Sequence, residues 1–253
     1  MNATASHRRI FIGDVHGHYE GLMHLLAAIA PASSDQIYFV GDLIDRGPQS
    51  SQVIEFIRRH NYPCVLGNHE QLLLDAFPDG QVHMPALQGW LYSGGQSTLG
   101  SYQEIEHLLD HIAWIRELPL YLDLDDILLV HAGVDPQLAL ADQTAQELCW
   151  IRDVFHSSTT PYFDDKLIIT GHTITFTFPR VEPGQIVRGQ GWLDIDTGAY
   201  HPKSGWLTAL DYDRDQVIQY NVHQERLRTR SLADATTTVE PNQVMRRQQR
   251  AIA

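Results

Sequence analysis

Apolar and polar residues alternate with two different periods in the first third of the chain. Short apolar runs with the length and composition of buried β-strands occupy residues 9–12, 36–40 and 64–66. Each run is followed by a polar turn and then by apolar residues at helical spacing, at residues 19–30, 50–60 and 71–76. This order predicts three successive β–α units with parallel pairing of the strands.

The remainder of the chain is richer in predicted strands. Residues 78–100 form a looser stretch, and residues 101–116 then return to helical periodicity. Two apolar runs joined by an acidic turn predict a hairpin at 120–122 and 127–130. Further strands are predicted at residues 167–170, 186–187, 193–195, 206–210 and 217–220. The simplest arrangement is an α/β fold in which two mixed sheets pack face to face with helices outside.

The length of the chain agrees with one folded unit. A chain of 253 residues with 43% hydrophobic residues can bury a full core without being divided. We therefore expect a single catalytic domain over residues 1–227. Polar and charged residues dominate from residue 228 onward, which predicts a mobile C-terminal tail over residues 228–253.

Charge and cysteine content exclude several classes of protein. The net charge of −13 argues against a nucleic-acid or membrane partner, so an anionic substrate would have to meet a local positive site. Cys64 and Cys149 lie far apart in the sequence and are interpreted as small core residues, not as a disulfide or a thiolate zinc site. No stretch approaches about 18 uninterrupted apolar residues, and a soluble, cytoplasmic protein is expected.

Potential metal ligands follow the ends of the predicted strands. They are Asp14 and His16 in GDVHG, Asp42 in GDLIDRG, Asn68 in GNHE, His131 in HAG and His172 in GH. The carboxyl ends of neighbouring strands converge on one crevice in an α/β sheet, so these side chains can meet. Carboxylate, imidazole and amide ligands suit Mn²⁺, Fe or Zn²⁺ better than Ca²⁺ or Mg²⁺. Six ligands exceed what one catalytic metal takes from a protein, which predicts a pair of divalent metal ions.

The order and spacing of these five motifs, between about residues 8 and 222, resemble one family. It is the phosphoprotein phosphatase branch of the calcineurin-like metallophosphoesterases, in its compact bacterial or phage type. The resemblance implies a four-layer αββα sandwich with two metal ions, for which Mn²⁺ is favoured and Fe or Zn²⁺ are alternatives. It also implies that Asp14 and His16 hold the first ion, that Asp42 bridges both, and that the second is held by Asn68, His131 and His172.

The resemblance, together with the chemistry of phosphoryl transfer, assigns further roles. Two metal ions lower the pKa of a shared water, and the resulting bridging hydroxide attacks phosphorus in line. Arg46 and Arg152 resemble the family's guanidinium clamp on the phosphoryl oxygens. His69 resembles the general acid that protonates the leaving group, and Asp45 the carboxylate that orients it. The role of Glu70 is open: it either takes part in catalysis directly, or its carboxylate stabilises the first turn of the helix that follows.

Other features have structural interpretations beside functional ones. The SGGQS segment at residues 93–97 either serves a turn or approaches the substrate. Asp196 in DTGAY either serves a turn or supports a ligand histidine. Ile174 stands where the family often has proline, which affects the local turn and not the ligand His172. Histidines outside the motifs, among them His107 and His111, are interpreted as surface or satisfied polar residues.

Three functions remain as hypotheses. The favoured one is removal of phosphate from phosphoserine or phosphothreonine in a phosphoprotein or phosphopeptide, with phosphotyrosine as a further substrate. The alternative is symmetrical hydrolysis of dinucleoside tetraphosphates by a related family with the same metal and arginine set. That family usually has aspartate in its third motif, so Glu70 favours a phosphoprotein. A catalytically inactive metal-binding module is disfavoured because every expected position is filled. The sequence leaves the oligomeric state open.

Overall fold

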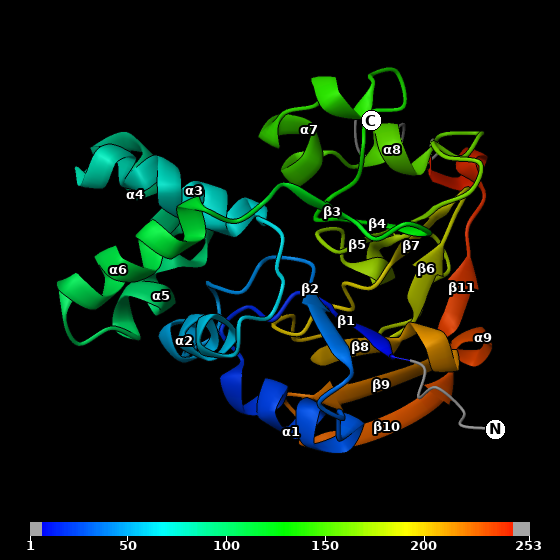
Figure 1. Ribbon diagram of the computed structural model, residues 1–253, viewed down its shortest axis with the longest axis horizontal. Helices are drawn as coiled ribbons and strands as arrows, with labels where there is room; N and C mark the ends of the chain where they lie inside the picture. Colours follow the sequence, from blue (N-terminus) through cyan, green and yellow to red (C-terminus); the bar gives the residue numbers. More distant parts are fainter. Residues whose placement is uncertain (1–6, 245–253) are drawn as a thin grey trace.

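The strands of the molecule form two stacked mixed sheets (Figure 1). The computed structural model describes residues 7–244, and within this range the first sheet has five strands in the order β10-β9-β8-β1-β2. These strands are β1 (Arg9–Ile12), β2 (Gln36–Phe39), β8 (Trp206–Asp211), β9 (Gln216–Asn221) and β10 (Arg226–Ser231). Strand β1 pairs in parallel with β2 and antiparallel with β8. The predicted parallel pairing of the first two units is confirmed.

The second sheet carries the predicted hairpin. Its order among the described residues is β11-β6-β7-β5-β4-β3. The strands are β3 (Tyr121–Asp123), β4 (Ile127–Val130), β5 (Leu167–Thr170), β6 (Ile186–Arg188), β7 (Trp192–Asp194) and β11 (Thr236–Thr238). Strands β3 and β4 pair antiparallel, whereas β4, β5 and β7 are parallel neighbours. Both sheets are therefore mixed, as predicted.

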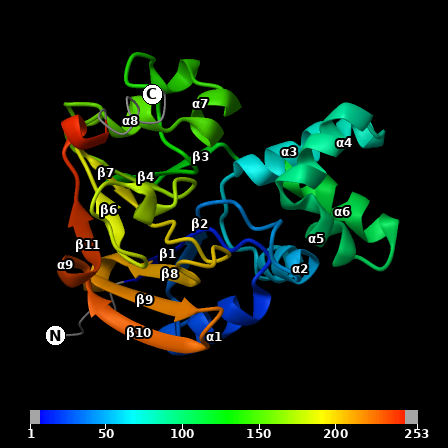
Figure 2. The same cartoon turned by 180° about the vertical axis from the view of Figure 1, so that it is seen from behind.

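Helices cover the outer faces of the sandwich and extend to one side of it (Figures 1 and 2). Helix α1 (Tyr19–Ile29) packs on the first sheet, and α7 (Ala145–Trp150) and α8 (Asp153–His156) lie over the second. A lateral group contains α2 (Ser50–His60), α3 (Asn68–Ala76), α4 (Met84–Trp90), α5 (Gln96–Gly100) and α6 (Ile105–Arg116). The predicted α/β fold, with helices outside two face-to-face sheets, is confirmed.

The apolar core runs through the layers of the sandwich. Phe11 and Val40 from the first sheet pack with Leu129, Ile169 and Leu193 from the second, and all five are fully buried. Burial on both faces explains why these strands have nearly continuous apolar sequences. The two cysteines are buried free thiols, as predicted.

Two local predictions were wrong in the first half of the chain. Residues 78–100 are largely helical, because α4, a π-helical segment (Leu91–Gly95) and α5 follow one another there. Glycines made this segment resemble a loop, but the buried Trp90 anchors it in the core. The apolar run at residues 64–66 forms only a single bridge, between Phe39 and Cys64, before the chain turns at Gly67.

The predicted boundary at residue 228 was also wrong, because it falls inside strand β10. Residues up to 244 continue through α9 (Leu232–Ala235) and β11, and Val239 and Val244 are buried in the core beside the second sheet. Strand β10 lies at the edge of its sheet and is mostly exposed, so its sequence is polar although its backbone pairs along its whole length with β9. Residues 245–253 of the predicted tail lie outside the described residues.

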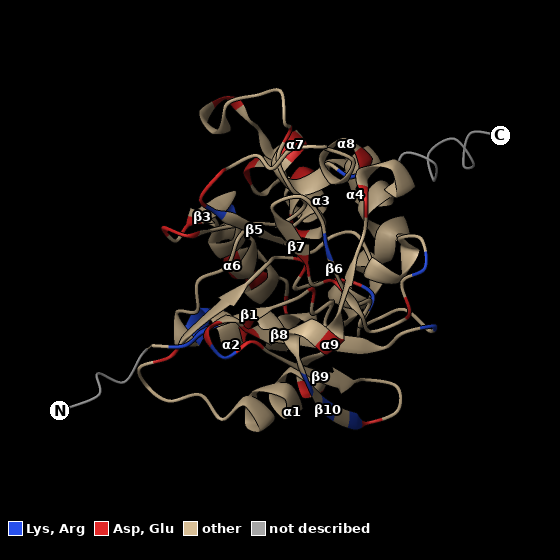
Figure 3. Cartoon of the chain, turned by 90° about the vertical axis from the view of Figure 1, so that its right-hand side faces the viewer, with Lys and Arg blue, Asp and Glu red and all other residues tan. Residues whose placement is uncertain are grey.

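Charged residues are spread over many elements and not gathered on one face (Figure 3). An acidic turn joins β3 to β4, and Asp123, the last residue of β3, is paired with Lys166. No helix among the described residues is long and apolar enough to cross a membrane.

Replacing Val239 with alanine tests whether the C-terminal segment belongs to the core. Val239 is 2% exposed, so Val239→Ala should lower the free energy of unfolding by about 2 kcal/mol through lost burial and cavity formation. Urea denaturation would measure the change, with the exposed Thr238→Ala as a control. Equal stability of the two variants would show that residues after 228 do not stabilise the fold.

Candidate metal centre

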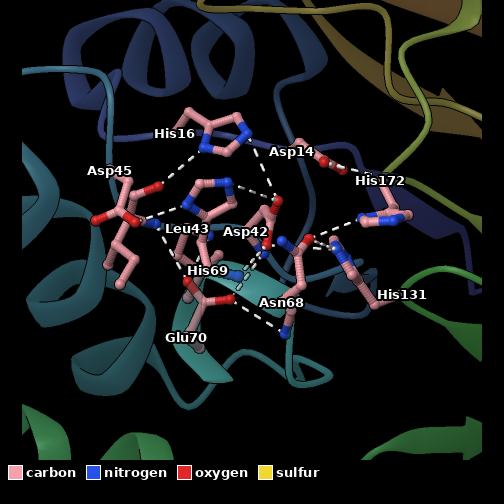
Figure 4. A network of polar contacts seen from close by, with 12 residues as sticks. Asp14, His16, Asp42, Leu43, Asp45, Asn68, His69, Glu70, His131 and His172 are labelled. Carbon is pink, nitrogen blue, oxygen red and sulfur yellow. Dashed lines mark hydrogen bonds and ion pairs between the residues drawn. The ribbon is translucent and has the colours of Figure 1, made fainter. Parts of the chain in front are cut away.

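Loops that follow strands of both sheets bring polar side chains together in one network (Figure 4). Asp14 and His16 follow β1, Asp42 follows β2, and Asn68 begins α3. From the second sheet, His131 follows β4 and His172 follows β5. The structure buries all six predicted metal ligands and places them together.

The Asp42 carboxylate lies at the centre of this group. Its Oδ1 is 3.3 Å from His131 Nε2, and its Oδ2 is 3.5 Å from His16 Nε2. The same Oδ2 is 4.0 Å from Nε2 of His69, the predicted general acid. Asp42 therefore faces histidines on two sides, as a carboxylate bridging two metal ions would.

A second set of contacts joins Asn68 to the histidines of the other sheet. Asn68 Oδ1 lies 2.7 Å from His172 Nδ1 and 3.0 Å from His131 Nε2. The backbone N–H of His172 donates to Asp14 Oδ2 at 3.0 Å. Asp14, predicted for the first ion, thus also contacts the residues predicted for the second.

The donor atoms fit divalent cations. His131 Nδ1–H donates to Val40 O at 2.8 Å and His16 Nδ1–H donates to Ile44 O at 2.9 Å, so in a neutral ring each Nε2 lone pair points toward Asp42. Lone pairs directed at carboxylate oxygens repel unless a cation lies between them. In addition, the buried Asp14 Oδ1 and His172 Nε2 have no hydrogen-bond partner among the described residues, which a metal ion would supply.

Electrostatics agree with this fit. Burial, together with Asp196 and Asp42, raises the pKa of Asp14 well above its usual range. Burial also lowers the pKa of His16 and of His172 well below the usual range, so these two rings are neutral and carry no positive charge to compensate the carboxylates. A divalent cation bound beside Asp14 would favour the ionised form of this carboxyl group.

Glu70 fixes the loop that presents Asp42. Its Oε2 accepts the N–H groups of Asp42 (2.8 Å) and Gly67 (3.1 Å), and its Oε1 accepts those of Leu43 (2.9 Å) and Ile44 (3.2 Å). Burial raises the pKa of Glu70 to about 8, with further contributions from Asp42 and Asp45, while the Leu43 and Ile44 donors oppose the shift. Glu70 is fully buried and acts on the backbone, which resolves its open role in favour of a structural one.

The loops adopt an unusual backbone conformation at the site. Positive φ angles occur at His16 (46°), Asp42 (48°) and His172 (69°), and also at Asp45 (72°) and Arg46 (71°). Such angles are uncommon for residues with a Cβ atom and cost on the order of 1–3 kcal/mol each. Their concentration at predicted functional residues indicates that the surrounding contacts hold the side chains in fixed directions.

Two glycines allow the loops to approach one another. A Cβ atom on Gly67 would lie 2.4 Å from Asp42 Oδ1, and one on Gly171 would lie 2.0 Å from Asp14 Oδ1. Any larger residue at either position would displace a carboxylate of the site.

His69 and Asp45 form a hydrogen-bonded pair beside the ligands. His69 Nδ1–H donates to Asp45 Oδ2 at 2.6 Å, which directs Nε2 toward Asp42. Asp45 also accepts hydrogen bonds from Thr98 Oγ1 (2.7 Å) and Trp90 Nε1 (3.0 Å). Asp45 is therefore held rigidly, and it fixes the orientation of the imidazole.

The two predicted arginines line the cleft above the ligands. The cleft has a volume of about 190 Å³, and its lining includes Arg46, Arg152, His69, Asp196 and Tyr200. The guanidinium of Arg46 lies over the ring of Tyr200, 4.0 Å from its centroid. Arg152 Nη1 donates to His172 O (3.4 Å) and to Thr173 Oγ1 (3.3 Å). Both side chains are exposed toward solvent and can reach an anion in the cleft.

The sequence did not identify several residues that support the site. Trp90 and Thr98 lie on either side of the SGGQS segment, whose Gly94 carbonyl accepts the Arg46 N–H at 3.2 Å. This segment and its two neighbours therefore position Asp45 and Arg46. The sequence had suggested for the segment a turn or an approach to the substrate. Asp196 accepts the Gly198 N–H at 2.8 Å and lines the cleft, with no hydrogen bond to a ligand histidine among the described contacts. The Gly198 contact agrees with the turn interpretation of Asp196, and support of a ligand histidine stays a prediction.

Comparison with known families agrees with the geometry. Residues 7–197 match the sequence profile described as calcineurin-like phosphoesterase. The chain belongs to this family. Membership of this family implies divalent metal ions. The ligand atoms of two groups of three buried residues lie within 4.8 Å of one another, namely His16, Asp42 and His69, and Asp42, His131 and His172. The first group contains His69, the predicted general acid, and not Asp14, the predicted ligand.

Similar curated proteins are symmetrical bis(5'-nucleosyl)-tetraphosphatases. The protein from Klebsiella pneumoniae is 32% identical over 164 residues, which cover 62% of this chain and 53% of the relative. The protein from Buchnera aphidicola is 36% identical over 132 residues, which cover 50% of this chain and 44% of the relative. The chain thus spans about half the length of these curated relatives.

Solved structures share the fold at low sequence identity. A chain provisionally described as a diadenosine tetraphosphatase has a TM-score of 0.59 at 18% identity, with coverage of 90% of this chain and 95% of its own. A cold-active protein-tyrosine phosphatase of Shewanella sp. has a TM-score of 0.56 at 20% identity, covering 88% and 80%. Proteins named for different substrates have this calcineurin-like fold, so the fold does not identify the substrate.

Replacing Glu70 with alanine tests its structural role. The buried N–H groups of the Asp42 loop would lose their acceptor, at a cost of about 1–3 kcal/mol for each group left unpaired. We expect Glu70→Ala to lower the free energy of unfolding by roughly 3 kcal/mol or more and to weaken binding of divalent metal. Urea denaturation and metal titration would measure both effects, with the exposed Glu104→Ala as a control. Equal stability of Glu70→Ala and the control would contradict this role.

Proposed function

We propose that this protein hydrolyses dinucleoside tetraphosphates symmetrically. The observation that carries the proposal is its 32–36% identity to curated enzymes named for that reaction. The protein-tyrosine phosphatase shares only 20% sequence identity with this chain, so its similarity concerns the fold and not the substrate. This proposal replaces the phosphoprotein substrate favoured by the sequence.

The position of Glu70 removes the main reason for preferring a phosphoprotein. That preference depended on glutamate standing where the tetraphosphatase motif usually has aspartate. Glu70 is 0% exposed and bonded to four backbone N–H groups, so it has no access to substrate in the cleft. Glu70 therefore does not act directly on the group being hydrolysed.

The six buried ligands would hold two divalent ions. In the proposed arrangement one ion is bound by Asp14, His16 and Asp42, and the other by Asp42, Asn68, His131 and His172. Such ions lower the pKa of water and neutralise phosphoryl oxygens. Two cations in addition to two arginines would give an acidic chain the local positive site that an anionic substrate needs.

The remaining site residues bind and protonate the substrate. Arg46 and Arg152, which line the cleft, would bind phosphoryl oxygens, because planar guanidinium groups form paired charge-assisted hydrogen bonds with them. The Tyr200 ring covers one face of the Arg46 guanidinium and so limits the movement of this side chain. His69 would donate a proton from Nε2 to the leaving oxygen, while Asp45 accepts the Nδ1–H and fixes the orientation of the ring.

The size of the cleft agrees with recognition of the phosphate chain. Pockets that enclose a whole drug-sized ligand usually measure about 300–1,000 Å³, whereas this cleft measures about 190 Å³. It would enclose the phosphates, and the two nucleosides would extend over the open surface around it.

A comparison of substrates tests the proposal. With Mn²⁺ supplied, we expect kcat/KM for diadenosine tetraphosphate to exceed that for a phosphoserine peptide at least tenfold, with ADP as the sole nucleotide product. Asp42→Asn should abolish both activities. A higher kcat/KM for the phosphopeptide would restore the protein phosphatase hypothesis, and equal amounts of AMP and ATP would exclude symmetrical cleavage.

The role of His69 predicts a dependence on the leaving group. A phosphate leaving group has a pKa near 6, whereas a phenol has a pKa of about 10 and needs more help from an acid. His69→Gln should therefore lower kcat for phenyl phosphate by about 10²–10⁴-fold and lower kcat for diadenosine tetraphosphate less. The exposed His60→Gln is the matched control. An equal loss on both substrates would show that His69 does not donate this proton.

A further inference from the structure

A second cluster of metal-ligating side chains lies between helices α2 and α6, which pack against each other in the lateral helix group (Figures 1 and 2). It consists of Glu55 on α2 and of His107 and His111 on α6. One ligand atom of each residue lies within 4.8 Å of the others. None of the three lines the cleft above Asp42.

The sequence of α6 places both imidazoles on one face of the helix. His107 and His111 are four residues apart, so their side chains lie one above the other. Their ring centroids are 4.3 Å apart. The same His-x-x-x-His spacing lets two histidines on a helix bind one zinc ion, and Glu55 supplies a carboxylate from the facing helix.

His111 is oriented by a contact on its far side. Its side chain is 0% exposed, its Nε2 lies 3.3 Å from Glu55 Oε2, and its Nδ1 lies 2.8 Å from the Tyr102 hydroxyl. A hydroxyl can donate or accept, so it can accept a hydrogen bond from Nδ1–H and leave the Nε2 lone pair directed at Glu55. Metal-binding histidines commonly have such a partner on the second ring nitrogen.

The charges around the cluster leave room for a cation. Arg58 of α2 is paired with Asp110, and among the described residues Glu55 forms its salt bridge with His111 and not with Arg58 or Arg59. The Glu55 side chain is 49% exposed and His107 is exposed, while His111 is buried beneath them. Solvent therefore reaches the ligand atoms from one side.

We propose that Glu55, His107 and His111 form a zinc site that links α2 to α6. Two imidazoles and one carboxylate are a common zinc ligand set, and a water molecule would complete a tetrahedron from the open side. Helix α2 directly follows the loop that carries Asp45 and Arg46, and the Ser51 N–H at its start donates to Ser101 Oγ. The bound ion would therefore stabilise the helices that support this loop.

Zinc binding by the full-length, tag-free protein tests the site. Elemental analysis after dialysis against micromolar Zn²⁺ should find one more equivalent per chain in the wild type than in His107→Gln or Glu55→Gln. The proposed metal centre at Asp42 would also bind zinc, but its residues are unchanged in these variants, so it contributes the same zinc content to each protein. The exposed His83→Gln and Glu106→Gln are matched controls and should retain the additional equivalent.

A second variant tests the role of Tyr102. Tyr102→Phe should keep the additional equivalent but bind it about tenfold or more weakly, as expected when a histidine ligand loses its orienting partner. Unchanged zinc affinity in Tyr102→Phe would overturn that orienting role. The same zinc content in His107→Gln, in Glu55→Gln and in the wild type would overturn the site itself, whatever the substrate of the enzyme proves to be.

Discussion

The buried carboxylate of Asp42 is the constraint on which the rest of the site depends. It lies against imidazoles from both sheets, with His16 on one side and His131 on the other. The hydrogen bonds that fix those rings leave their free nitrogens directed at it. Removing such a group from water is costly unless a compensating charge is present. This requirement is the physical basis of our proposal that two divalent ions bind here.

Much of the surrounding structure serves to hold that carboxylate in place. Asp42 has a left-handed backbone, and Glu70 compensates for this strain by accepting N–H groups along the loop. Gly67 leaves space for the carboxylate where any side chain would collide with it. The backbone carbonyl of Asp42 also accepts the N–H groups of Val15 and His16, which ties together the loops after β1 and β2. A rigid scaffold of this kind can direct ligands accurately.

The sequence predicted those parts of the molecule that local pattern determines. The apolar runs located most strands, and the polar residues after them located the ligands, because strand ends converge in an α/β fold. The arrangement of the sheets and the grouping of Asp14, Asp42 and His172 followed from these two observations.

Features set by long-range contacts could not be predicted in this way. Trp90, Thr98 and Tyr200 act on Asp45 and Arg46 from distant parts of the chain, and no local period marks them. Edge strand β10 has a polar sequence because its side chains are mostly exposed. His107 and His111 resembled surface histidines until the fold brought Glu55 beside them.

Electron paramagnetic resonance of the protein loaded with two equivalents of Mn²⁺ tests the central claim most directly. Mn²⁺ prefers oxygen-rich ligand sets, so it should enter the centre at Asp42, with two carboxylates and an amide oxygen, before the site on α2 and α6, which offers the single carboxylate of Glu55. We predict the spectrum of two magnetically coupled ions in the wild type, and loss of the coupling in Asp42→Asn. Spectra of isolated, uncoupled Mn²⁺ in the wild type would contradict a pair of ions bridged by Asp42.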